Sequence, residues 1–443
     1  MGDGTDRAGG SAAEPGPERR RRIGTLMRGL AIDVTPLRRS RDYRVMWTGQ
    51  LIGLSGRQIT AVALPFQVFL LTRSSLAVGL IGLAQIVPLV VVGIGTGPLA
   101  DRIDRRRLIL LSELGLAITS LLLLAGALWG RPPLWYLYVL AGTQAGLSGI
   151  SGPARSASIP NLVSREQLPA AMALTQVLFN TSMIVGPALA GVILARYGLT
   201  WAYGAELASC VGSVAAALML RPLPPKREEG SEVPSGWLAI REGFSFLRGR
   251  RVLLSTFAID LNAMVFGMPR ALFPVLALQV FRVGPEGLGL LYAAPSVGAL
   301  LGALTTGWVG RIRRQGRAVV WAVAVWGLAI TAFGLSGRFF GLALLCLAIA
   351  GAADVISAVF RGTILQLSLP DTLRGRISGI HIMVVTGGPR LGDVEAGLVA
   401  SLVSPWFSVV SGGVACVVGA AVLAAAVPEF LGYSTPSEGL LEQ

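Results

Sequence analysis

The chain has 443 residues, of which 53% are hydrophobic and only 14% are charged. Soluble domains carry about a quarter charged residues, so this composition excludes an ordinary soluble protein, and the long, unalternating apolar runs exclude a β-barrel. The net charge of +14 does not indicate a nucleic-acid partner, because the arginines fall in tails and between apolar runs. The composition therefore predicts an all-α membrane protein that crosses the bilayer many times.

Residues 1–43 are polar and contain the run Arg19–Arg22. No apolar segment with a small-residue cleavage site follows, so they predict a disordered cytoplasmic tail rather than a signal peptide. Twelve apolar segments come next, each long enough for the roughly 20 residues that a helix needs to cross a bilayer. The expected spans are 45–71, 76–100, 108–129, 134–153, 170–195, 201–220, 252–279, 287–310, 317–336, 339–360, 376–403 and 406–428.

The loop between the second and third spans is short and charged. It reads Gly97-Pro98-Leu99-Ala100-Asp101-Arg102-Ile103-Asp104-Arg105-Arg106-Arg107. Its arginines predict a cytoplasmic turn, since short loops rich in Lys and Arg resist translocation. An ordinary positive-inside loop would explain these arginines, but not Gly97 and Asp101, and a glycine there permits close approach of a neighbouring helix.

The distribution of arginines predicts the orientation of the chain. With the N-terminus inside, most basic residues between spans fall on the cytoplasmic side, and Arg155 and Arg361 are counted among them. The opposite loops hold only Arg73, Arg131, Arg196, Arg282 and Arg338. Both termini are therefore expected in the cytoplasm.

The longest internal connection, 221–251, divides the spans into six and six. Within it, residues 236–248 place Trp237, Ile240, Phe244 and Leu247 at helical spacing, which predicts an amphipathic helix in the cytoplasmic interface. A poorly ordered linker is the alternative. The expected domains are a six-span bundle at 44–220, this linker, a second bundle at 252–428 and a cytoplasmic tail at 429–443.

The Gly97 loop resembles the signature loop between helices 2 and 3 of the major facilitator superfamily. Other segments resemble the branch that contains enterobactin exporters and multidrug efflux pumps: Gly152–Val163, Gly186–Gly191, Gly289–Pro295 and Leu373–Gly379. The resemblance implies twelve helices in two six-helix bundles, with Gly186, Pro187 and Gly191 forming a helix-packing motif. The loop at 307–314 corresponds to the Gly97 loop in the second half, with Arg311 in place of the aspartate.

Two features bear on the transport cycle that the family implies. The arginine loop is expected to act as a gate through Gly97, Asp101, Arg102, Arg105 and Arg106, with its charges contacting helix ends, acids or lipid phosphates. Span 11 departs from the family pattern, because Arg390, Asp393 and Glu395 replace small uncharged residues. Arg390 and Asp393 lie three apart on one helical face, where a structural ion pair and a transport role are both open.

Ionisable residues within spans are the remaining candidates for function, because burying a charge in the bilayer is costly. No catalytic constellation or phosphate-binding Gly-x-x-x-x-Gly-Lys segment is present, so an ion gradient is the expected energy source. The ionisable candidates are Arg57, Glu113, Glu206, Asp260, Arg270, Asp354, Arg390, Asp393 and Glu395. The alternatives are that Glu113 braces the arginine loop, that Glu206 faces water near the outer end of span 6, and that His381 is a packed residue.

The resemblance implies that spans 1, 4, 7 and 10 line the central cavity. This favours Arg57, Asp260, Arg270 and Asp354 for the substrate and proton pathway. Polar and aromatic side chains on cavity spans are expected to add contacts to substrate: Gln58, Tyr138, Gln144, Asn262, Phe66 and Phe266.

The expected function is secondary active export, with two bundles that rock around a midplane site. We expect proton antiport of a small amphipathic molecule such as a siderophore, an antibiotic or another drug. The expected partners are this substrate, protons and the lipid of the bacterial cytoplasmic membrane; the chain is expected to be a monomer and to use no cofactor, metal or nucleic acid. An importer on the same scaffold and a non-transporting membrane sensor or assembly partner are the alternatives.

Asp260 is the expected coupling acid, with Arg57 on the symmetry-related first span as its cation. If the two approach in one conformation and separate in the other, proton occupancy would depend on which way the cavity faces. A permanent pair that only satisfies two buried charges is the alternative.

Overall fold

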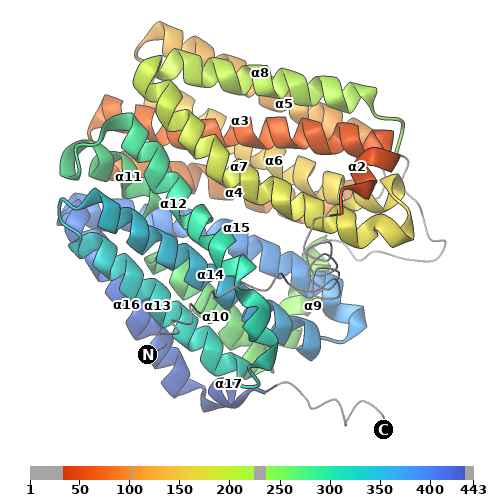
Figure 1. Ribbon diagram of the computed structural model, residues 1–443, viewed down its shortest axis with the longest axis vertical. Coiled ribbons are helices and arrows are strands. Elements are labelled where there is room, and N and C mark those ends of the chain that lie inside the picture. Colours follow the sequence, from red (N-terminus) through yellow and green to blue (C-terminus); the bar gives the residue numbers. More distant parts are fainter. Residues whose placement is uncertain (1–32, 101–102, 224–235, 435–443) are drawn as a thin grey trace, which may run out of the picture.

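The computed structural model describes residues 33–100, 103–223 and 236–434, and within these ranges the chain is helical, with no β-strand. In Figure 1 the N-terminal half lies above the C-terminal half, with its long helices side by side. The N-terminal half contains α3 to α8, and the C-terminal half contains α10 to α16. The prediction of an all-α membrane protein is confirmed.

The helices of the N-terminal half are connected by short turns. They are α2 (Thr35–Arg39), α3 (Arg41–Thr72), α4 (Ser75–Ala100), α5 (Arg105–Trp129), α6 (Leu134–Leu162), the 3-10 turn η1 (Arg165–Gln167), α7 (Leu168–Arg196) and α8 (Gly198–Met219). Helix α9 (Gly236–Arg248) lies between the halves.

The C-terminal half repeats the up-and-down arrangement. Its elements are α10 (Arg251–Phe266), η2 (Arg270–Leu272), α11 (Phe273–Val275), η3 (Leu276–Val280), α12 (Gly284–Leu304), η4 (Thr306–Arg311), α13 (Gln315–Leu335), α14 (Phe340–Ser368), α15 (Asp371–Leu402), α16 (Pro405–Ala426) and α17 (Pro428–Gly432).

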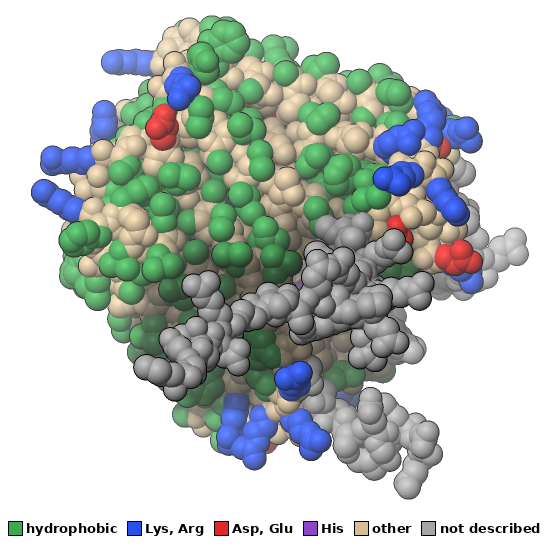
Figure 2. Space-filling model, viewed as in Figure 1, with side chains coloured by type: hydrophobic (Ala, Val, Ile, Leu, Met, Phe, Trp, Pro, Cys, Tyr) green, Lys and Arg blue, Asp and Glu red, His purple; other side chains and the backbone are tan. Residues whose placement is uncertain are grey.

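Ten of the described helices are long and apolar enough to cross a membrane. Helices α6 and α15 are equally long but are not among the ten. Figure 2 shows hydrophobic side chains across the middle of the visible face, with arginines gathered at its margins. A wide apolar surface between charged margins is the arrangement that a lipid bilayer stabilises.

Helix α5 shows how the polarity of each helix is arranged. Its side chains Leu111 and Ile118 are 63% and 59% exposed, whereas Ser112, Glu113 and Ser120 are buried. Apolar side chains therefore face outward and polar side chains face the bundle, the reverse of a soluble protein. Hydrogen-bonded polar groups are thus available inside each half for function.

The two ends of the bundle differ in charge. One end, which we call the basic end, carries the loops with Arg105–Arg107, Arg248–Arg251 and Arg311–Arg317, together with α2 and α9. The other end, which we call the opposite end, carries the short turns at Arg73, Arg131 and Arg338. The long helices alternate between these ends because their connections are short.

The seventh span, expected at 252–279, is interrupted at Gly267–Pro269. Helix α10 ends at Phe266, and the chain continues through η2, α11 and the π-helical turn η3. Pro269 has no N–H to donate, so the backbone near it needs other partners. Trp326 Nε1 donates to the carbonyl of Gly267 at 2.8 Å, and the amide of Ala271 donates to Asp393 Oδ1 at 3.1 Å.

The halves meet through backbone contacts near the opposite end. Helix α7 packs on α12, and α4 packs on α15. A Cβ at Gly289 would lie 2.5 Å from the carbonyl oxygen of Pro187, and a Cβ at Gly79 would lie 2.4 Å from that of Asp393. Only glycine permits such close approach. We call Gly79, Gly191, Gly289 and Gly397 the glycine seal.

The segments that flank the two halves are more ordered than predicted. Residues 33–43, expected within a disordered tail, contain α2 and the start of α3, where the hydroxyl of fully buried Tyr43 donates to the carbonyl of Ala171 at 2.8 Å. The expected C-terminal tail begins with α17, whose Phe430 is fully buried. Residues 1–32 lie outside the described residues.

The predicted helix at 236–248 is confirmed as α9, and it is packed against the protein. It contacts α4, α10 and α15, and Leu247 is buried in a cluster with Leu253 and Ile380. Phe244 is 52% exposed. The helix therefore touches both halves at the basic end (Figure 1).

Candidate functional site

A cluster of three ionisable residues lies inside the N-terminal half. Arg155 Nη2 of α6 lies 2.9 Å from Glu113 Oε1 of α5, and Arg57 Nη1 of α3 lies 3.5 Å from the same oxygen. Ser151 donates to Glu113 Oε1 at 3.1 Å, and Arg155 donates to Ser213 at 3.1 Å. We call Arg57, Glu113 and Arg155 the N-triad; Glu113 and Arg155 are buried, and the Arg57 side chain is 17% exposed.

A second acid lies in the same half. Glu206 of α8 is fully buried and accepts hydrogen bonds from the hydroxyl of Thr60 and, at 3.2 Å, from Gln144 Nε2. One turn away, Tyr203 donates to Gln67 Oε1 at 2.7 Å. These polar groups connect α3, α6 and α8 inside the bundle.

The C-terminal half holds a cluster of two acids and one arginine, whereas the N-triad has two arginines and one acid. Arg361 Nη2 of α14 lies 2.7 Å from Asp260 Oδ1 of α10 and 3.7 Å from Asp354 Oδ1 of α14. Arg361 Nη1 donates to Ser357 at 2.5 Å. We call Asp260, Asp354 and Arg361 the C-triad. Asp260 and Arg361 are buried, whereas the Asp354 side chain is 30% exposed.

The arginines of the two triads occupy matching positions in matching helices. Helices α6 and α14 each have 29 residues, and Arg155 follows Leu134 at the same interval as Arg361 follows Phe340. In both helices a serine four residues earlier bonds to the guanidinium, Ser151 at 3.2 Å and Ser357 at 2.5 Å. The shared Ser-x-x-x-Arg element is a structural repeat between the halves, as expected of transporters built from two related bundles.

The charges of span 11 lie beside the break in span 7. Asp393 Oδ2 lies 3.8 Å from Arg390 Nη1, so the i,i+3 ion pair is confirmed. Asp393 Oδ1 accepts the amide of Ala271, and Tyr292 donates to the carbonyl of Arg270 at 3.2 Å. Asp393 therefore stabilises the interrupted helix of span 7. This is a structural role for one of the charges by which span 11 departs from the family pattern.

Three acids have other surroundings in this structure than those considered from the sequence. In this conformation Asp260 pairs with Arg361 rather than with Arg57, because Asp260 and Arg361 project into the same bundle. Glu113 pairs with Arg57 and Arg155 instead of bracing the arginine loop. Glu206 is fully buried and hydrogen-bonded, so it does not face water.

The arginine loop contacts backbone rather than acids. Arg105 donates to the carbonyl of Ala157 at 2.6 Å, and Arg106 donates to those of Ala217 and Leu218. Because unpaired carbonyls gather at helix ends, these arginines bind the ends of α6 and α8. Gly97 lies in α4, and Asp101 and Arg102 lie outside the described residues, so the gating role of the loop stays a prediction.

Several side chains that were expected to contact substrate instead bond to or pack against other parts of the protein. Asn262 donates to the carbonyl of Cys416 in α16 at 2.9 Å, and Tyr138 donates to that of Ala77 at 2.9 Å. Gln58 is half-buried beside Gly186, and Phe66 is buried. Phe266, Arg270 and Glu395 are half-buried, and His381 packs edge-on to Phe257 with ring centroids 6.0 Å apart.

Sequence reasoning missed Arg155 and Arg361, which it assigned to cytoplasmic loops. Both helices continue past their predicted ends, so both arginines are buried inside them. The signal was present in the repeated Ile-Ser-x-x-x-Arg at Ile150 and Ile356. Among the described residues, no group of three or more His, Cys, Asp or Glu side chains is arranged to hold a metal ion.

Comparison with known proteins places this arrangement in a family. Residues 32–438 match the family described as transmembrane secretion effector, a branch of the major facilitator superfamily. The enterobactin exporter EntS of Citrobacter koseri is 31% identical over 373 residues, covering 82% of this chain and 86% of that protein. EntS of Shigella boydii is 29% identical over 375 residues, covering 84% and 88%.

Solved structures share the fold at low sequence identity. The nucleoside transporter NupG superposes with a TM-score of 0.73 at 12% identity, over 88% of this chain and all of that one. A bacterial homologue of the lysosomal transporter Spinster, in an inward-facing and unoccupied conformation, gives 0.67 at 16% identity over 91% and 100%. The chain therefore belongs to the transmembrane secretion effector family of the major facilitator superfamily and is a multi-pass membrane transporter.

Proposed function

We propose that this transporter exports a siderophore-like small molecule by proton antiport, with twelve spans and both termini in the cytoplasm. The substrate class rests on similarity to enterobactin exporters over more than four fifths of the chain. The orientation rests on the excess of arginine at the basic end, because loops rich in arginine stay in the cytoplasm. Helices α6 and α15 complete six spans in each half on this proposal.

The contacts between the halves support alternating access. The glycine seal holds α7 to α12 and α4 to α15 near the opposite end, which is the outer end in this orientation. A transporter closed at its outer end presents its site to the cytoplasm, where an exporter loads its substrate. Release then requires the seal to part while the basic end closes.

The C-triad is the single observation that carries proton coupling. It holds two carboxylates and one guanidinium, so it has one negative charge more than its cation neutralises. Asp260 Oδ2 is buried and accepts no hydrogen bond from the described residues. A proton bound there would neutralise the net negative charge of the cluster, and its release would restore the full Asp260–Arg361 attraction.

The half-exposed Asp354 suggests how the cycle turns. It lies on the same helix as Arg361 and one ångström farther from it than Asp260, so the guanidinium has two alternative acidic partners. Movement of Arg361 toward Asp354 would free Asp260 to take a proton. Substrate and proton would then compete for the same cluster, which is what antiport requires.

Everted membrane vesicles test this proposal. With inward proton pumping, vesicles containing the native protein should accumulate enterobactin, and an uncoupler should release it. Asp260→Asn mimics the protonated acid, so it should exchange enterobactin across the membrane without accumulating it. Asn262→Ala, on the same helix but bonded to α16, is the matched control and should keep accumulation.

The outcomes separate the alternatives. Proton-driven loss of enterobactin from the vesicles would indicate an importer, and absence of any flux by a folded protein would indicate a sensor or assembly partner. Uphill, pH-dependent accumulation by Asp260→Asn would rule out Asp260 as the coupling acid.

A further inference from the structure

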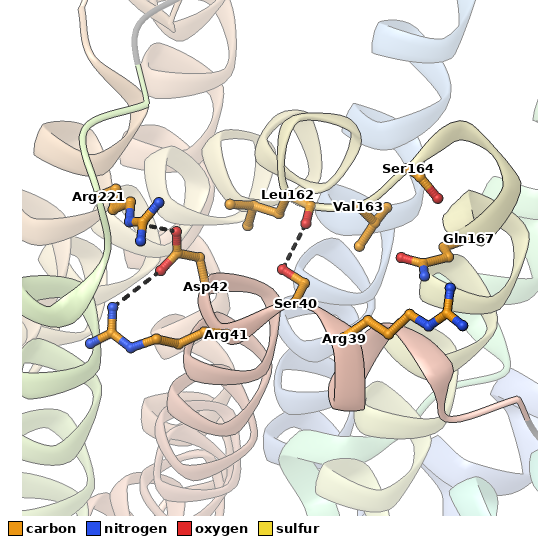
Figure 3. Close-up of a pocket in the computed structure, with 9 residues that line it drawn as sticks. All are labelled: Arg39, Ser40, Arg41, Asp42, Leu162, Val163, Ser164, Gln167 and Arg221. Atoms are coloured by element: carbon orange, nitrogen blue, oxygen red, sulfur yellow. Dashed lines mark hydrogen bonds and ion pairs between the residues drawn. The ribbon is translucent and has the colours of Figure 1, made fainter.

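An open cleft of about 450 Å³ lies at the basic end of the N-terminal half, apart from both triads. It is bounded by the start of α3, the end of α6, the turn before α7 and the end of α8. Figure 3 shows its lining: Arg39, Ser40, Arg41, Asp42, Leu162, Val163, Ser164, Gln167 and Arg221.

The walls of the cleft are held in place by tertiary contacts. Ser40 lies between α2 and α3, and its hydroxyl donates to the carbonyl of Leu162 at 2.7 Å (Figure 3). The same hydroxyl accepts the amide of Tyr43. Pro36 of α2 is buried, and Leu37 packs against the cluster around Tyr43. Arg39 at the end of α2 and Arg41 at the start of α3 are therefore presented on a fixed support.

The cleft carries more cations than it neutralises. Arg41 and Arg221 flank one carboxylate, Asp42, which lies 3.6 Å from Arg41 Nη1 and 3.7 Å from Arg221 Nε. Arg39 also lines the cleft but extends away from Asp42, toward Gln167 (Figure 3). The side chains of Arg41 and Arg221 are 55% and 77% exposed, so most of their N–H donors remain open to solvent. Several guanidinium groups around one open volume suit a phosphate group, which takes bidentate hydrogen bonds from arginine.

The position of the cleft favours a membrane lipid over a soluble anion. The cleft lies where α3, α6 and α8 leave the apolar part of the protein, which is the level of lipid headgroups. Leu162 and Val163 give it an apolar floor beside the polar donors Ser164 and Gln167. A phospholipid offers both a phosphate and adjoining apolar carbons, whereas a free phosphate offers only the first.

We propose that this cleft binds the phosphate headgroup of an anionic phospholipid, through Arg39, Arg41 and Arg221. A lipid held there would join the start of α3 to the ends of α6 and α8. The proposal needs the basic end to lie at a membrane surface, but it does not depend on the substrate or on proton coupling. Lipid binding and transport are therefore tested by separate experiments, and either proposal can fail without the other.

Binding of phosphatidylglycerol to the full-length protein in detergent tests the site. The test variant is Arg39→Gln/Arg221→Gln, because both side chains are exposed and neither holds the fold together. Each arginine near an anionic surface contributes about 1 kcal/mol, so the double variant should bind phosphatidylglycerol ~30-fold more weakly. The matched control is Arg196→Gln/Arg338→Gln, two exposed arginines at the opposite end, which should bind as the native protein does.

Two further measurements test whether the ligand is an anionic lipid or free phosphate, and whether positive charge in the cleft drives binding. Phosphatidylcholine and inorganic phosphate at equal concentration should not displace phosphatidylglycerol. Asp42→Asn removes the one carboxylate of the cleft and should tighten binding, since it raises the net positive charge. Equal affinity of the native and Arg39→Gln/Arg221→Gln proteins would overturn the proposal, as would full displacement by inorganic phosphate or weaker binding by a folded Asp42→Asn variant.

Discussion

Each triad has an arginine at the matching position of its helix, Arg155 in α6 and Arg361 in α14, but the two triads have net charges of opposite sign. In the N-triad, Arg155 shares Glu113 with Arg57, so two cations face one acid. In the C-triad, Arg361 faces Asp260 and Asp354, so two acids face one cation. One repeated scaffold thus carries two different electrostatic sites, and only the second has a carboxylate to spare for a proton.

Replacing the repeated arginine by alanine should give the largest difference in stability between the two triads. Arg361→Ala leaves two carboxylates without their cation, and removal of one member of a buried pair costs about 3–5 kcal/mol. Arg155→Ala leaves Glu113 with Arg57 3.5 Å away, so its loss of stability should be clearly smaller. Thermal unfolding of the two variants in detergent measures the difference. Equal losses would mean that the surplus of charge has no energetic consequence.

A double variant should sharpen the same point. Arg361→Ala/Asp260→Ala removes the cation together with its nearest acid, so the remaining Asp354 is partly solvated. The double variant should recover part of the stability lost by Arg361→Ala, with a coupling of about 1–3 kcal/mol. A double-mutant cycle on unfolding measures this coupling. Strict additivity would argue against a direct Asp260–Arg361 interaction.

Replacing one acid in each triad by its amide should distinguish an acid that transport needs from an acid that stability needs. Asp354→Asn keeps the Asp260–Arg361 pair, so it should fold normally and lose uphill accumulation while downhill exchange continues. Glu113→Gln leaves buried Arg155 and partly exposed Arg57 without an acid, so it should lower the stability of the protein. Vesicle transport together with unfolding checks both variants. Normal uphill transport by Asp354→Asn would remove this acid from the coupling mechanism.

The smallest difference between the triads is expected from the serines that orient the arginines. Ser357→Ala and Ser151→Ala each remove a hydrogen bond to a charged group, which contributes about 1.5–3 kcal/mol. Ser151 also donates to Glu113, so its loss should cost more than that of Ser357. Unfolding temperatures rank the two. The reverse order would show that the Arg361–Ser357 contact is the stronger support.

The helices were predictable from the sequence because their apolar runs are long and separated by charged turns. The expected span 76–100 became α4 at Ser75–Ala100, and the expected amphipathic helix at 236–248 became α9 within the same bounds. Gly267 and Pro269 inside a span indicate a kink, but not its partners, since the freed carbonyl and amide are satisfied by Trp326 and Asp393 from distant helices.

The site was harder to predict than the fold. A buried arginine and a loop arginine have the same hydropathy, so the sequence alone places Arg155 and Arg361 in loops. The partner of Asp260 lies about a hundred residues away, and helix packing, not sequence spacing, brings the two together. The acids themselves, Asp260 and Asp354, were identified because charge inside an apolar run is conspicuous.

The glycine seal has a consequence for how the transporter responds to its surroundings. Because backbone meets backbone across α7–α12 and α4–α15, attraction at these contacts is dispersive rather than ionic. Dispersion is insensitive to dissolved salt, whereas surface ion pairs weaken as salt is added. Opening of the opposite end should therefore proceed at the same rate in dilute and in saline media, a useful property if, as in the proposed orientation, this end faces an ionic environment that the cell does not control.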